Sequence, residues 1–211
     1  GVPGTRRRVI GFWFPGEHQV AVRAKAGGMS AEDHAALVAL LHAHSFRRGH
    51  FTLASGRPSS YYVDARPTTM SANGLSVIGR LGLQAIRDAG WAPALVGGLT
   101  LGADPVAYAI AAASVREPPV IDGFTVRKEV KDHGTARRIE GPFRAGVSVV
   151  VVEDVITTGG SALRAIEAVH GAGGQVLGVL AVVDREEGGH ETLTAAGYPV
   201  VALVRLAELT D

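Results

Sequence analysis

The sequence contains no cysteine among its 211 residues. Disulfide bonds, thiolate nucleophiles and zinc sites built on thiolates are therefore excluded. The absence is compatible with a reducing compartment but does not prove one.

An excess of charge of one sign is also lacking. Lys and Arg number 21 and Asp and Glu 20, for a formal net charge of +1. This balance gives no general attraction to nucleic acid or to an anionic membrane, so any anion site has to come from local clustering. No apolar run approaches the length of a membrane span, and no secretory signal is recognisable. We expect a cytoplasmic protein with neither membrane nor nucleic acid as a partner.

The composition suits one sizeable α/β domain with an appendage, since 46% of residues are hydrophobic and Gly is frequent at 28. Alternation of strands and helices predicts a central parallel sheet flanked by helices. Ligands of such sheets collect beyond the carboxyl ends of the strands. The predicted strands cover residues 94–96, 120–127, 147–152, 175–183 and 199–204.

Residues 1–29 differ from the remainder, with five basic residues against the single acid Glu17. We expect an N-terminal extension, native or not, that precedes one domain at 30–211; a basic arm that touches a partner is the alternative. Within the domain we expect a small N-terminal hood at about 30–66 and a core at about 70–205. The hood should hold a helix over 31–43 and a hairpin that turns at Ser55-Gly56.

The most informative stretch begins with the valine-rich strand 147–152, which is apolar on both faces as in a buried parallel strand. Glu153 and Asp154 follow, then the turn Thr157-Thr158-Gly159-Gly160-Ser161 and a helical run over 162–170. Glycines let backbone N–H groups approach an anion, and the helix N-terminus adds its positive dipole end. The turn is therefore predicted to bind phosphate.

The two acids would repel a phosphate, so sugar hydroxyls or a cation that accompanies the ligand are their natural partners. The pattern indicates a phosphorylated sugar, with its phosphate in the turn and its diol on Glu153 and Asp154. It is neither a Walker loop nor the dinucleotide fingerprint, because Gly-Lys-Ser/Thr and Gly-x-Gly-x-x-Gly are both absent. A strand-turn-helix with merely solvated acids is the alternative.

A second stretch, residues 124–134, gathers four cationic or potentially cationic side chains: Arg127, Lys128, Lys131 and His133. The polar run continues to about 142, and long polar loops in compact α/β domains are often lids. Taken alone, such a run is more often a solvated loop. Beside the first motif it suggests cations that stabilise a phosphate leaving group and exclude water.

Together these stretches resemble the type I phosphoribosyltransferases and, among them, the orotate phosphoribosyltransferase family. Glu153 to Ser161 resembles the signature for 5-phosphoribosyl 1-pyrophosphate (PRPP), and Arg127 to Gly134 resembles the orotate family's catalytic loop. Phe51 to Asp64 resembles its base-binding segment, and Asp184-Arg185 with Gly188-Gly189 its late orotate-binding turn. The resemblance covers about residues 30–210.

The resemblance implies the type I phosphoribosyltransferase fold and transfer of the phosphoribosyl group from PRPP to orotate. Orotidine 5′-monophosphate and pyrophosphate would be the products, in pyrimidine (UMP) biosynthesis. It implies Mg²⁺ held mainly by PRPP with no direct protein ligand. It also implies a homodimer whose 128–141 loop is shared across subunits.

Residue roles follow by the same resemblance. Lys131, Glu153 and Asp154 would be catalytic, while Thr157 and Arg185 would bind orotate. Arg185 suits this role because a guanidinium pairs bidentately with the orotate carboxylate. PRPP would be bound by Arg127, Lys128, Lys131, His133, Glu153, Asp154, Val155, Ile156, Thr157, Thr158, Gly159, Gly160 and Ser161.

Some alternatives stay open. Arg185 could instead form a salt bridge with Glu186 or Glu187. One of Tyr61 and Tyr62 could stack on the base while the other joins the core. A transferase for another base and a PRPP-sensing regulator that binds RNA or DNA are the rival functions.

The chain also departs from the family pattern. Many relatives carry a lysine where this chain has Ala54, and another in the loop equivalent to 98–104, which has none here. Backbone N–H groups and Mg²⁺ would then have to offset more of the pyrophosphate charge. We interpret this as a subfamily difference. His42, His44, His50 and His190 lack metal-ligand spacing and are expected at the surface or in packing roles.

Overall fold

The computed structural model describes residues 30–52, 56, 58–128 and 138–210. Its centre is a six-stranded sheet in the order β5-β4-β3-β6-β7-β8, parallel except for the antiparallel edge strand β5. The predicted α/β architecture is confirmed. The strands are β3 (Leu95–Leu99), β4 (Asp122–Val126), β5 (Ile139–Glu140), β6 (Ser148–Ile156), β7 (Gln175–Asp184) and β8 (Val200–Arg205).

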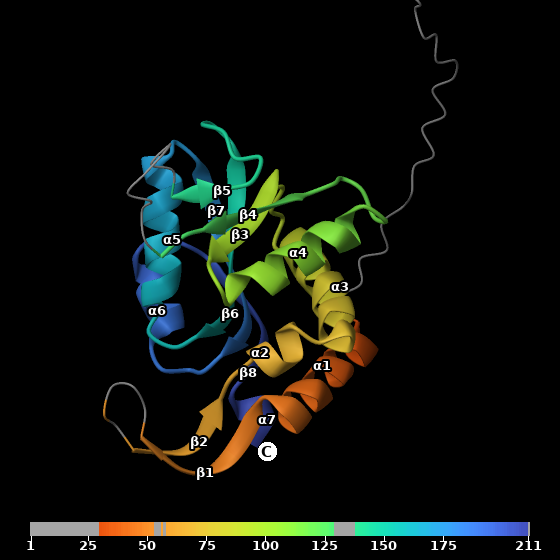
Figure 1. Cartoon of the computed structure of the whole chain (residues 1–211), viewed down its shortest axis with the longest axis vertical. Coiled ribbons are helices and arrows are strands. Elements are labelled where there is room, and N and C mark those ends of the chain that lie inside the picture. The colour runs from red at the N-terminus through yellow and green to blue at the C-terminus, as the bar shows by residue number, and fades with distance from the viewer. Residues whose placement is uncertain (1–29, 53–55, 57, 129–137, 211) are drawn as a thin grey trace, which may run out of the picture.

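Helices cover both faces of this sheet (Figure 1). Helices α3 (Ala72–Asp88) and α4 (Ala103–Ser114) pack on one face, and α5 (Gly160–Gly171) and α6 (Gly189–Ala195) pack on the other. The valines of β6 alternate between the two cores: Val150 and Val152 face α3 and α4, whereas Val149 and Val151 face α5. Burial on both faces is why this strand reads as a continuous apolar run.

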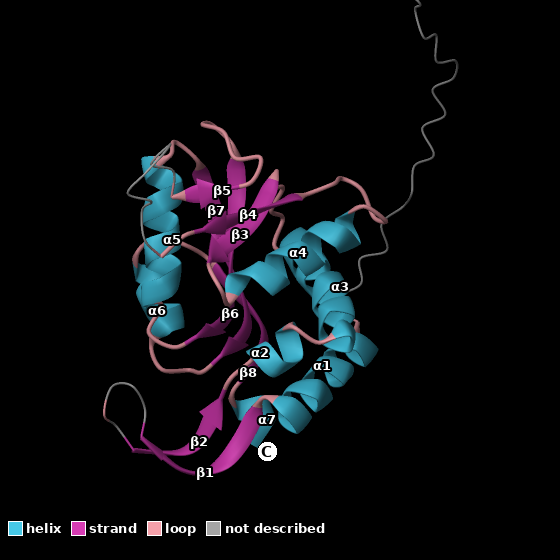
Figure 2. Ribbon diagram, in the orientation of Figure 1, coloured by secondary structure: helices cyan, strands magenta, loops and turns pink. Residues whose placement is uncertain are grey.

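The hood consists of a helix and a two-stranded antiparallel sheet that is separate from the main sheet, and it shares the buried core that contains α3 and α4 (Figure 2). It comprises α1 (Ala31–His44), β1 (Phe46–Thr52), β2 (Pro58–Val63) and the start of α2 (Arg66–Thr69). The C-terminal helix α7 (Ala207–Thr210) contacts the hood and holds it in place. His34 Nε2 lies 3.0 Å from Glu208 Oε2, and Arg48 Nη2 donates to the Thr210 carbonyl.

Local sequence features account for the ends of two helices and for the buried face of α1. The hydroxyl of Ser30 accepts from the Asp33 N–H at the start of α1, and Ser71 caps α3 through the Gly74 N–H. Helix α3 ends at Asp88, and Gly90 follows in the left-handed region with φ +71°. Leu37 and Leu41 of α1 are fully buried.

Other boundaries were wrong. Strand β6 does not end before the acids but continues through Glu153 and Asp154 to Ile156, because β7 pairs with it that far. Strand β3 extends to Leu99 rather than Val96, and the loop predicted over 128–142 contains β5. The short helices α2 and α7 were not predicted. Residues 1–29 lie outside the described residues, so their separate status stays a prediction.

Among the helices that the structure describes, none combines the length and apolarity that crossing a bilayer requires.

Candidate active site

The turn after β6, Thr157 to Ser161 (the β6 turn), leads directly into α5 at the carboxyl edge of the sheet. Its residues line a cavity of about 130 Å³, together with Glu153, Val155, Ile156, Ala162 and Arg164. A cavity of this size suits one small anion, since sites for whole drug-sized ligands span roughly 300–1,000 Å³. The structure therefore brings nearly all residues of the predicted PRPP motif around one small polar space.

Gly159 gives the β6 turn its shape. Its φ of +82° lies in the left-handed region, and a Cβ there would lie 3.2 Å from the Gly189 carbonyl oxygen and from Leu193 Cγ. No side chain caps the start of α5. The first N–H groups of this helix can therefore serve an anion in the cavity.

Arg164 is a functional candidate that the sequence analysis missed. It lines the cavity, and its Nη2 donates to the Ser161 hydroxyl at 3.2 Å. The sequence spacing could have identified it, because residues three apart on a helix share a face and Arg164 follows Ser161 by three positions. Arg164 adds a cation to a turn that otherwise offers only N–H and hydroxyl donors.

Glu153 is buried, with 5% of its surface exposed. Burial, with a smaller contribution from the nearby Asp154 charge, raises the pKa of its carboxyl to about 8, and the Arg164 cation opposes both effects. Its Oε1 has no hydrogen-bond partner among the described residues. A buried oxygen in this state is ready to accept a hydrogen bond from a ligand hydroxyl.

Asp154 faces a different neighbourhood and does not line the small cavity. Its Oδ1 accepts from the Val155 N–H at 2.9 Å. Burial raises the pKa of this carboxyl and the Asp64 charge adds to the rise, while the Val155 N–H and the Arg66 guanidinium oppose it. The two acids therefore present their carboxyl groups on the two sides of β6, as alternation along a strand requires.

Arg185 follows β7, the strand beside β6, and its N–H donates to the Ile156 carbonyl at 3.0 Å. The side chain is buried, with Nη2 2.7 Å from Glu187 Oε1 and the guanidinium carbon 5.7 Å from the centre of the Tyr61 ring. Neither Nε nor Nη2 makes a hydrogen bond to a described residue, although Nη2 is in ionic contact with Glu187. The salt bridge foreseen as an alternative is thus present, and guanidinium donors still lack a protein hydrogen-bond acceptor among the described residues.

The two candidate tyrosines differ. Tyr61 is half-buried against the main core, stacks on Phe46 and lies under Arg185. Tyr62 is 41% exposed and contacts Phe51, with ring centres 5.6 Å apart. Tyr61 is therefore the ring that shares the Arg185 neighbourhood.

The predicted catalytic loop is only partly described. Arg127 lies just after β4 and pairs with Glu140 of β5, Nε to Oε1 2.7 Å, and Lys128 is exposed. Lys131 and His133 lie outside the described residues, so their roles stay predictions. Among the residues that the structure does describe, no group of three His, Asp or Glu could hold a metal ion on its own.

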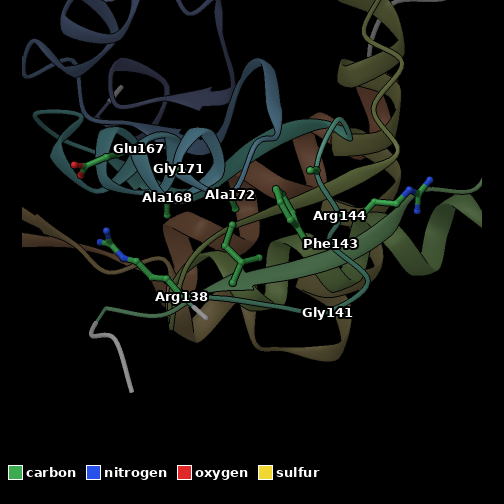
Figure 3. A pocket seen from close by; sticks show the side chains of 10 residues that line it. Arg138, Gly141, Phe143, Arg144, Glu167, Ala168, Gly171 and Ala172 are labelled. Atoms are coloured by element: carbon green, nitrogen blue, oxygen red, sulfur yellow. The ribbon is translucent and has the colours of Figure 1, made fainter. Parts of the chain in front are cut away.

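A larger cavity, about 750 Å³, lies away from the two acids. It is lined by six residues from the segment 138–145 and by the C-terminal half of α5 with Ala172, and Figure 3 shows Phe143 between Arg138 and Arg144. Gly171, at its rim, lies about 16 Å along the helix from Gly160 in the β6 turn, at 1.5 Å per residue. Cavity volume therefore does not identify the active site in this protein. The hydrogen-bond donors and acids around the β6 turn identify it instead.

Comparisons with known proteins agree with this geometry. The model of the phosphoribosyl transferase domain matches residues 71–195. Curated orotate phosphoribosyltransferases from Rhodopirellula baltica and Mycobacterium avium are 42% and 50% identical, over 83% and 82% of this chain and 93% and 94% of theirs. The crystal structure of Mycobacterium tuberculosis orotate phosphoribosyltransferase in complex with PRPP is 43% identical, with a TM-score of 0.71, covering 85% of this chain and 99% of that one.

The sheet, the β6 turn and the matched domain define a phosphoribosyltransferase. Identity above 40% over almost the full length of these relatives narrows the assignment. The chain belongs to the orotate phosphoribosyltransferase family.

Proposed function

We propose that this chain transfers the 5-phosphoribosyl group from PRPP to orotate, giving orotidine 5′-monophosphate and pyrophosphate in pyrimidine nucleotide synthesis. The observation that carries the proposal is the adjacency of two turns. The β6 turn offers an anion site beside two acids, and the turn after β7 carries the buried Arg185, held to β6 by its own backbone. A phosphorylated sugar and a carboxylate-bearing base can therefore meet at one edge of the sheet.

In the reaction the bond from ribose C1 to the pyrophosphate oxygen breaks and a bond from C1 to an orotate nitrogen forms, while that nitrogen gives up its proton, which the departing pyrophosphate can accept. The ribose becomes cation-like as the pyrophosphate departs, so groups that hold the sugar and exclude water assist the step. Glu153 and Asp154 are proposed to hold the ribose hydroxyls, and the β6 turn, with Arg164, the 5-phosphate. Thr157 and Arg185 are proposed to bind orotate.

Lys131 is proposed to assist the departing pyrophosphate, with Arg127, Lys128 and His133 as further contacts. We propose that the 128–141 loop reaches the neighbouring subunit of a homodimer. Mg²⁺ is proposed to neutralise charge on PRPP, which would itself supply most of the ligands. The cytoplasmic location also stays a prediction.

A transferase for a different base is the nearest alternative. Arg185 argues for orotate, because uracil lacks the carboxylate that a guanidinium recognises. A PRPP-sensing regulator that binds RNA or DNA is the alternative from another class, and the balanced charge of the chain does not favour it.

The test is consumption of orotate by the purified chain, followed with PRPP and Mg²⁺ present and with each omitted in turn. Turnover should require both. The same assay with uracil, adenine, guanine and hypoxanthine measures base specificity. Turnover of another base in place of orotate, or tight RNA binding with no turnover, would contradict the proposal.

A further inference from the structure

Asp104, in the first turn of α4, holds two hydroxyl groups from different segments. Its Oδ2 accepts from the Thr100 hydroxyl at 2.6 Å, and its Oδ1 accepts from the Thr125 hydroxyl at 2.8 Å. Thr100 follows β3, and Thr125 belongs to β4. The carboxylate therefore ties the loop 100–103 to the neighbouring strand, through short hydrogen bonds of the charge-assisted kind.

Tyr108 extends this network. Its hydroxyl lies 2.6 Å from the Thr125 hydroxyl. Thr125 has one hydroxyl proton, which it donates to Asp104, so Tyr108 is the donor and Thr125 the acceptor. The proton donors run in one direction, from Tyr108 to Thr125 to Asp104, and Thr125 is the link on which both ends depend.

The loop 100–103 lies against the proposed sugar site. The Thr100 N–H donates to the Val126 carbonyl at 2.8 Å, which fixes the start of the loop on β4. At Gly102 the backbone comes so close to Asp154 that a Cβ would lie 2.5 Å from its Oδ1. Strand β3 also pairs directly with β6, so the two carboxyl ends share one edge.

Stereochemistry then places the leaving group. A nucleophile that displaces a group from ribose C1 with inversion approaches from the face opposite the departing group. Arg185, proposed to hold the base, follows β7 on one side of β6, and the loop 100–103 follows β3 on the other. A ribose seated on the β6 acids therefore directs its pyrophosphate toward the loop 100–103.

On the basis of the proposed function, we infer that Asp104 is a positioning residue for pyrophosphate, acting with Thr125 and Tyr108 on the loop 100–103. An acid near a pyrophosphate would otherwise repel it. Here both carboxylate oxygens of Asp104 accept hydrogen bonds from hydroxyl groups, so its charge holds the loop in place. The backbone N–H groups of the loop then stay available to bind pyrophosphate. The loop contains no lysine, so its shape carries more of the binding.

The decisive measurement compares two ligands by titration calorimetry in Mg²⁺: pyrophosphate and ribose 5-phosphate. Thr125→Val should weaken pyrophosphate binding about tenfold and leave ribose 5-phosphate binding within twofold, because the 5-phosphate lies in the β6 turn. Thr125→Ser keeps the hydroxyl and should restore the wild-type ratio. Asp104→Asn should resemble Thr125→Val, and Tyr108→Phe should have a smaller effect in the same direction.

Ser114→Ala is the matched control. Its hydroxyl also links α4 to the β4 region, accepting from the Ile121 N–H at 2.9 Å, but at the opposite end of the helix. This variant should lose stability without changing either dissociation constant. Unchanged pyrophosphate binding in Thr125→Val, or equal weakening of both ligands, would overturn the inference. If the wild-type chain does not turn over orotate, the proposed function is wrong. The ratio of the dissociation constants for pyrophosphate and ribose 5-phosphate tests the role of Asp104 independently of that result.

Discussion

At the carboxyl edge of the sheet, the β6 turn and the turn after β7 are built in different ways. The β6 turn draws its donors from one continuous segment, and only Arg164 comes from the next turn of the helix. Arg185 is positioned by parts that are distant in the sequence: its strand, Glu187 and Tyr61 of the hood. A continuous site is fixed by local backbone geometry, whereas an assembled site depends on how the hood and the core pack together.

The variant Arg185→Ala should show the largest effect on the site that follows β7. We expect kcat/KM for orotate to fall about 100-fold, since loss of one partner of a buried, hydrogen-bonded charge pair costs ~2–5 kcal/mol. The KM for PRPP should change little. Steady-state kinetics with each substrate varied in turn measures both values.

Glu187→Gln is the companion variant, because it removes the ion-pair partner of Arg185 and keeps the size of the side chain. If Arg185 served only this salt bridge, both variants would lose equal stability and neither would change the KM for orotate. That result would remove Arg185 from the orotate site.

Gly159→Ala should have the next largest effect, on the other substrate. Displacing N–H donors of the β6 turn should weaken PRPP binding about 30-fold, since a hydrogen bond to a charged group is worth ~1.5–3 kcal/mol. Fluorescence or calorimetric titration with PRPP measures the change.

Gly197→Ala is the control for this variant. Gly197 also has a positive φ, +92°, but it lies after α6, where a Cβ would meet no atom within 4 Å. Both variants should lose ~1–2 kcal/mol of stability. Equal PRPP affinity in the two would contradict the role of the β6 turn.

The buried acid should make stability depend on pH. The folded chain holds the Glu153 proton with a pKa of about 8, against 4.5 for the ordinary carboxyl. Between these values the folded state binds more protons than the unfolded state, so the free energy of unfolding falls as pH rises, by about 1.4 kcal/mol per unit. Below pH 4.5 this contribution is constant.

Urea unfolding at pH 5, 6, 7 and 8 measures this slope, and Glu153→Gln isolates it because the amide does not titrate. Asp154 and Arg164 remain in both proteins, so their contributions cancel in the difference. Parallel slopes for the two proteins would show that Glu153 is ionised throughout the range.

Arg164→Ala should have the smallest effect. Its side chain is exposed, and exposed ion pairs contribute ~0.2–1 kcal/mol, so the KM for PRPP should rise about threefold at low salt. The difference should shrink in 0.5 M salt because exposed charges are screened. Arg144→Ala, at the separate larger cavity, should leave this KM unchanged.

Sequence patterns predicted the continuous parts of the molecule well. The β6 turn and the alternation of strands with helices in a parallel sheet rest on local signals, and both are present. The strand ends were harder, because Glu153 and Asp154 have a polar sequence signature while pairing with β7 keeps them in the strand. Polarity alone could not reveal this partner.

The sites that combine residues distant in the sequence were harder to predict. Arg185 was identified from a family pattern, but its burial between Glu187 and Tyr61 depends on a contact across more than 100 positions in the chain. The network at Asp104 joins Thr100, Thr125 and Tyr108 through three separate elements. No spacing in the sequence signals it, because parallel strands bring together residues whose separation is set by the crossover helix.

The fastening of the hood by α7 has a practical consequence. Arg48 of β1 and His34 of α1 both contact residues of the final described helix, Thr210 and Glu208. Proteolytic trimming or a purification tag at that helix would therefore disturb Tyr61 from a distance. In such preparations we expect the affinity for orotate to fall before the affinity for the sugar phosphate does.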